Sequence, residues 1–147
     1  MNIGSVAHID HAVQQANVWL GELMMLMGWN EREQAYRALH VVLPALRQHL
    51  PADESADLAA QLPLIVRGLY FETWRPATEP VRDRSGDEFI SLIGRAFQNT
   101  PGASPSEIAK AVFELLSRHI SHGEIRQVQS VLPAGIRRYW PAYNASA

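Results

Sequence analysis

Hydrophobic residues recur every three or four positions along most of the chain, which is the spacing of one face of an α-helix. The main stripes are Val13, Ala16, Leu20, Leu23 and Met27; Ala35, Leu39, Val42, Leu46 and Leu50; Phe89, Leu92, Ile93 and Phe97; Ile108, Val112, Leu115 and Leu116; and Ile125, Val128 and Leu132. Further helices are expected after Pro51, Pro63 and Pro133, because proline suits the first turn of a helix. The pattern predicts an all-α protein of about eight helices.

The second part of the chain repeats the first at an offset of 70 residues, as Leu62-Pro63 and Leu132-Pro133 illustrate (132 − 62 = 70). At this offset the stretch 41–70 matches 111–140 without a gap. Identical pairs are Val42 and Val112, Leu46 and Leu116, His49 and His119, Glu54 and Glu124, and Arg67 and Arg137. Such periodicity is typical of a repeated structural unit.

The domain organisation follows from this repeat. We expect one compact domain over residues 1–147, made of two four-helix halves at about 8–74 and 85–141. The segment 75–84 contains two prolines and mixed charges but has no apolar period, which is typical of a connector.

Three serine–glutamate pairs mark helix starts in the second half. They are Ser85 with Glu88, Ser104 with Glu107, and Ser121 with Glu124. In such a capping box the serine side chain accepts the amide of the glutamate, and the glutamate side chain returns to the amide of the serine. We therefore expect a helix to begin after each serine.

Composition and charge exclude several classes of function. The 147 residues carry a formal net charge of −2, so the chain lacks the basic surplus that nucleic-acid binding requires, and no nucleic-acid partner is expected. There is no cysteine, hence no disulfide, thiolate nucleophile or cysteine-based zinc site. Neither a signal peptide nor an apolar run of ~18 residues is recognisable, so we expect a cytoplasmic protein with no membrane partner.

The run from Leu58 to Trp74, LAAQLPLIVRGLYFETW, preceded by ALRQHLP at 45–51, resembles a bacterial family known as domain of unknown function 2267. The similarity extends from the Asn17–Leu20 stretch to Trp140-Pro141. It implies a compact all-helical fold and carries over no catalytic residue. Thr73 stands where the pattern of the family leads us to expect glycine.

The densest aromatic and acidic cluster is Tyr70-Phe71-Glu72-Thr73-Trp74, and only the first half has it in full. Aromatic residues with an acid and a nearby arginine are typical of ligand pockets and of protein-binding hot spots. They are equally typical of a short helix end that fills a core. Our hypothetical ligand- or partner-binding set is Arg67, Tyr70, Glu72, Trp74, Arg137 and Trp140.

The recurring residues Glu54, Glu124, Arg67 and Arg137 favour a structural interpretation, because both halves keep them. We expect a glutamate–arginine pair within each half. A site between the halves is the alternative. No metal ligand set and no cofactor motif are predicted.

We interpret the chain as an intracellular binding or protein-interaction module without catalytic activity. Its partner would be another protein or a second copy of the chain. The alternative is a small-molecule-binding protein or an enzyme that uses a cleft between the halves, lined by Arg67, Glu72 and Trp74, with Arg137 and Trp140. Neither a catalytic triad spacing nor a carboxylate dyad is recognisable in the sequence.

Overall fold

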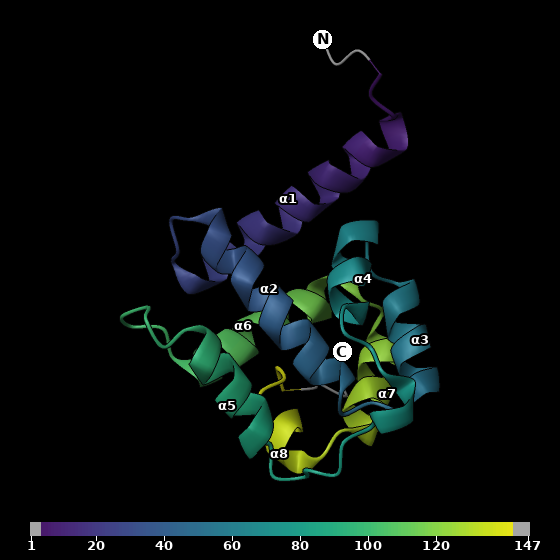
Figure 1. Ribbon diagram of the computed structural model, residues 1–147, viewed down its shortest axis with the longest axis vertical. Coiled ribbons are helices and arrows are strands. Elements are labelled where there is room, and N and C mark those ends of the chain that lie inside the picture. Colours follow the sequence, from purple (N-terminus) through teal and green to yellow (C-terminus); the bar gives the residue numbers. More distant parts are fainter. Residues whose placement is uncertain (1–3, 143–147) are drawn as a thin grey trace.

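The computed structural model describes residues 4–142, and within this range the chain forms helices and connecting segments without a strand (Figure 1). The α-helices are α1 (Ala7–Met27), α2 (Arg32–Arg47), α3 (Ala52–Ala60), α4 (Leu64–Phe71), α5 (Asp87–Ala96), α6 (Pro105–His119), α7 (His122–Val131) and α8 (Ala134–Arg137). A 3-10 turn, η1 (Pro76–Thr78), lies in the connector. The all-α fold class is therefore confirmed.

The core is one cluster of buried apolar side chains to which all eight of these α-helices contribute. Helix α2 packs against α1, α4, α5 and α6, and α6 packs in turn against α1 and α5. In Figure 1 α2 runs through the middle of the molecule, whereas the N-terminal turns of α1 project away from it. Burial of each large apolar side chain contributes about 1.5–3 kcal/mol, so this shared cluster joins the two halves energetically.

Helix positions follow the offset of 70 residues. Helices α3 and α7 begin at residues 52 and 122, and α4 and α8 begin at residues 64 and 134. The contact of α1 with α2 corresponds to that of α5 with α6, and the contact of α2 with α5 to that of α6 with α1. Helices α3 and α7 are themselves equivalents, and they pack on each other. These correspondences support the repeat proposed from the sequence.

The predicted helix starts have different outcomes. Ser104 and Ser121 precede α6 and α7 as expected, and the Ser121 hydroxyl accepts the Glu124 amide at 3.3 Å. The Ser85 prediction is wrong, because Asp83 accepts the amide of Glu88 at 3.1 Å instead. A left-handed turn at Gly86 (φ 83°) separates Ser85 from α5, and the Ser85 hydroxyl accepts the amide of Asp87 instead. Among residues 4–142 no helix is both long and apolar enough to cross a membrane.

Candidate functional site

Both recurring arginines bind the ends of helices. The bonds run from Arg67 Nε to the Ala59 carbonyl (3.0 Å) and Nη2 to the Leu62 carbonyl (2.8 Å), and from Arg137 Nε to the Gln129 carbonyl (2.9 Å) and Nη2 to the Leu132 carbonyl (2.7 Å). The two sets are equivalent under the offset of 70. Carbonyls at a helix C-terminus lack intrahelical partners, and these guanidinium groups supply the missing donors. The expected glutamate–arginine pair within each half is therefore wrong.

Tyr70 and Trp140 occupy equivalent positions, and both fill the core. Tyr70 is fully buried and its hydroxyl donates to Ser55 Oγ at 2.9 Å. Burial raises the pKa of the Tyr70 hydroxyl well above its usual value. Trp140 is buried as well and stacks on Phe113, with the ring centroids 4.2 Å apart. Because they contribute to the core, neither ring offers a free surface to a partner.

Trp74 has a different environment. Its side chain is 40% exposed and lies against Phe71, with the ring centroids 5.2 Å apart. The neighbouring Glu72 carboxylate meets His40 Nε2 at 3.1 Å, and the His40 ring lies 5.7 Å from that of Tyr36, which is also 40% exposed. Tyr36, His40, Glu72 and Trp74 therefore form a surface, called here the Trp74 surface.

The backbone beneath the Trp74 surface is held by a residue that sequence analysis overlooked. Arg47 is only 1% exposed, and its Nη1 donates to the carbonyls of Tyr70 (2.9 Å) and Glu72 (2.7 Å). Its Nε donates to Glu79 Oε1 at 3.0 Å, and this carboxylate is buried too. A charged residue beside Leu46 on the apolar face of α2 was the available signal. Arg47 thereby anchors both the end of α4 and the connector.

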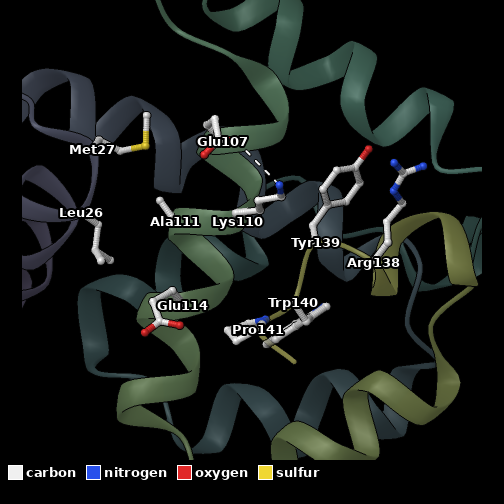
Figure 2. Close-up of a pocket in the computed structure, with 10 residues that line it drawn as sticks. All are labelled: Leu26, Met27, Glu107, Lys110, Ala111, Glu114, Arg138, Tyr139, Trp140 and Pro141. Atoms are coloured by element: carbon white, nitrogen blue, oxygen red, sulfur yellow. Dashed lines mark ion pairs between the residues drawn. The ribbon is translucent and has the colours of Figure 1, made fainter. Parts of the chain in front are cut away.

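A pocket of about 310 Å³ lies between α1, α6 and the segment that follows α8 (Figure 2). It is lined by Leu26, Met27, Glu107, Lys110, Ala111, Glu114, Arg138, Tyr139, Trp140 and Pro141. Of the residues proposed from the sequence, only Trp140 belongs to this pocket. Arg67 lines a separate hollow with Trp19 and His119. The arginines and aromatic residues proposed from sequence therefore do not share this pocket.

Three carboxyl groups converge where α3 packs on α7. One oxygen from each of Glu54, Asp57 and Glu124 lies within 4.8 Å of the other two. Glu54 and Glu124 are repeat equivalents, so the residues assigned to separate halves face each other between them. This is the carboxylate dyad that was not recognisable from spacing, because its members are 70 residues apart.

The Glu124 carboxyl group is released from the capping role that the sequence predicts. The amide of Ser121 donates to Gln61 Oε1 at 2.8 Å, and Gln61 Nε2 donates to the Ser121 hydroxyl at 3.1 Å. Gln61 thus occupies the position of the returning glutamate in a capping box. Burial, followed by the hydrogen bond to Glu54 and the charges of Glu54 and Asp57, raises the pKa of Glu124 to about 7.

Comparison with known proteins addresses the family. A search among curated proteins finds no match to the chain. The sequence model of the family described as "Uncharacterized conserved protein (DUF2267)" matches residues 16–139. The matched range takes in α2 to α8 completely and α1 from Ala16 onward, and it confirms the resemblance drawn from the Leu58–Trp74 run. The chain therefore belongs to the DUF2267 family of uncharacterized conserved proteins.

Proposed function

We propose that this chain is a protein-interaction module whose contact site is the Trp74 surface. The observation that carries the proposal is the 40% exposure of Trp74, in contrast to the buried Tyr70 and Trp140. Tryptophan and tyrosine supply a large share of the binding energy at protein interfaces, and Tyr36 lies on the same surface. Of the residues proposed from the sequence, Glu72 and Trp74 keep their side chains available, whereas Arg67 and Arg137 bind backbone carbonyls.

The Trp74 surface has a fixed base, which favours binding. Arg47 holds the carbonyls of Tyr70 and Glu72, the residues that lead up to Trp74. A side chain on a rigid backbone loses less conformational entropy on binding than one on a flexible loop. Thr73 has a positive φ of 67°, a costly conformation for a β-branched residue, and such strain is frequent at binding sites.

The chemistry of the Trp74 surface indicates what its partner carries. The exposed Glu72 carboxylate attracts a cation, and the faces of Trp74 and Tyr36 attract a cation or an apolar group. An arginine on the partner satisfies both, because its guanidinium group pairs with a carboxylate and stacks on aromatic rings. The proposed partner is therefore a protein that presents an arginine beside apolar side chains.

The test compares two side chains of equal exposure. Trp74 and Val131 are each 40% exposed, so Trp74→Ala and Val131→Ala remove similarly accessible groups. A protein captured by photo-cross-linking at position 36 is purified, and its affinity for each variant is measured by calorimetry. We expect Trp74→Ala to weaken binding by about 30-fold, as for a hot spot of about 2 kcal/mol, and Val131→Ala to leave it unchanged.

Two results contradict the proposal. The first is an affinity that Trp74→Ala leaves intact. The second is a loss of stability of about 3–5 kcal/mol in Trp74→Ala, which is typical of a core aromatic residue and makes Trp74 a plug. Sedimentation of the wild-type chain over a concentration series addresses the other occupant, a second copy.

A small-molecule-binding protein or an enzyme remains the second candidate, and the pocket of Figure 2 favours it. Its volume of about 310 Å³ lies at the lower end of the range for ligand sites. Lys110 and Arg138 offer cations to an acidic ligand there. A thermal-shift screen of small acids tests this candidate, with Lys110→Ala expected to abolish any stabilisation.

A further inference from the structure

The carboxyl groups of Glu54, Asp57 and Glu124 have a use that the Trp74 surface does not require. We propose that these three residues bind a hard divalent cation, of the class of Mg²⁺, Mn²⁺ and Ca²⁺, at the junction of α3 and α7. The site is independent of the proposed interaction surface, because it uses different residues on different helices.

The spacing of the oxygens suits a single ion. All three lie within 4.8 Å of one another. Oxygen ligands of these cations bind at about 2.0–2.6 Å, so two oxygens on one ion are at most about 4–5 Å apart. The donors are exclusively carboxylate oxygens, which favours hard cations over zinc or copper. Small side-chain adjustments bring the three groups to one ion without moving a helix.

Buried oxygens without partners supply the second observation. Glu124 is only 6% exposed, and its Oε2 has no hydrogen-bond partner among the described residues. Glu54 Oε1 is buried and unpartnered in the same way. A buried polar atom without a partner costs about 1–3 kcal/mol, and more if it is charged. These two atoms therefore require a proton or a cation.

The partners expected for these glutamates are used elsewhere. Arg67 and Arg137 donate to carbonyls at the ends of α3 and α7, and Gln61 takes the capping position at Ser121. Glu54 and Glu124 each lie in the first turn of a helix, where the helix dipole favours an ionised carboxylate. The ionised form is the one that binds a cation.

Asp57 gives the site an open side. It is exposed, whereas Glu124 is buried and Glu54 is intermediate. An ion can therefore enter past Asp57 and keep water ligands there. The repeat equivalent of Asp57 is Gln127, so the site has three carboxyl groups and not four. A divalent cation reduces their combined charge from −3 to −1.

Protons compete with the cation at this site. At low pH the two glutamates share a proton, in agreement with the raised pKa of Glu124. Ligands must lose their protons before a cation binds, so affinity rises with pH through this range. Between pH 6 and pH 8, which bracket the pKa of about 7, cation affinity should increase measurably.

The test is a titration of the full-length, EDTA-treated and desalted protein with Mn²⁺ at pH 8, followed by electron paramagnetic resonance. We expect one ion per chain with a Kd between about 10⁻⁷ and 10⁻³ M. Glu54→Gln and Glu124→Gln keep the shape of the side chain and should weaken binding at least about tenfold. Asp57→Asn, on the surface, should weaken it as well. Competition with Mg²⁺ and Ca²⁺ ranks the three ions.

The matched control is Asp53→Asn, which removes the same charge from α3 at an exposed position outside the three-carboxyl group. It should leave Mn²⁺ affinity unchanged. Equal affinity in wild type and Glu54→Gln/Glu124→Gln overturns the proposal, as does the absence of binding up to about 1 mM. Because Asp57→Asn affects only an exposed side chain, a fold defect in the glutamine variants does not remove the test.

Discussion

The helix pairs α3–α4 and α7–α8 are equivalent in the repeat, yet they bury different chemistry. In both, an arginine closes the end of the first helix with the same two bonds, through Arg67 and Arg137. In the first pair, the buried Tyr70 donates to Ser55. In the second, Trp140 stacks on Phe113, and its Nε1 has no partner among residues 4–142.

A second difference lies beneath these helices. Arg47 forms a buried ion pair with Glu79, whereas its equivalent in the second half is Ser117, which donates to a carbonyl of its own helix. The polar network of the first half is the place where the connector docks. Residues that recur thus hold the frame of each half, and unmatched residues hold the segment between the halves.

The largest expected effect comes from breaking the Arg47–Glu79 pair. Arg47→Met leaves a buried carboxylate and two carbonyls without a donor, so we expect a loss of about 3–5 kcal/mol in the free energy of unfolding. Urea denaturation measures this loss. Ser117→Ala, at the equivalent position, should change stability by less than about 0.5 kcal/mol. Arg47→Met/Glu79→Gln should recover part of the loss, and equal losses at both positions contradict the asymmetry.

Glycines in α4 and α8 should respond in opposite directions. A Cβ at Gly135 overlaps the carbonyl of Ser85, where the end of the connector crosses α8. A Cβ at Gly68 meets nothing within 4 Å. Gly135→Ala should therefore cost about 1–3 kcal/mol, and Gly68→Ala should stabilise the chain by about 0.5–1 kcal/mol. Thermal unfolding distinguishes them, and a stabilised Gly135→Ala would refute the close contact.

The carboxyl groups between α3 and α7 predict a dependence of stability on pH. The folded-state pKa of Glu124, about 7, exceeds its ordinary value of 4.5. The stabilisation from its bound proton is complete below about 4.5 and is lost as the pH rises through 7. In EDTA the thermal midpoint of the wild type should fall between pH 5 and 8, and Glu124→Gln should remove the part due to Glu124.

Each kcal/mol corresponds to roughly 2–4 °C in a chain of this size, so a fall of several degrees is measurable by calorimetry. Addition of Mn²⁺ at pH 8 should reverse it. A difference between wild type and Glu124→Gln that stays constant from pH 5 to 8 contradicts the raised pKa.

The smallest effect concerns the turn before Trp74. Thr73 has a φ of 67°, where glycine is free of strain and a β-branched residue is not. Thr73→Gly should stabilise the chain by about 0.5–1 kcal/mol, partly offset by the greater entropy of glycine in the unfolded chain. Gly28→Ala, at the left-handed end of α1 (φ 68°), should cost about 1 kcal/mol. A destabilised Thr73→Gly contradicts this account.

Much of the fold could be predicted from the sequence, because helix formation depends on residues three or four positions apart. The stripe that begins at Val13 ends at Gly28, and α1 ends there in a left-handed conformation. Ser104 and Pro105 start α6 as the capping pattern predicts. The departure at Thr73 was also visible, and the positive φ explains why the family pattern has glycine at this position.

The candidate site was decided by tertiary structure. Arg47 and Glu79 are 32 positions apart, and Glu54 and Glu124 are 70 apart, so no local pattern indicates that their charges meet. The repeat identified the glutamates as equivalents, but only the packing of α3 on α7 brings them together. By itself the sequence determined which faces of the helices are buried. Which charged groups become neighbours depended on how those faces pack, because side-chain contacts between helices are set by distance in space.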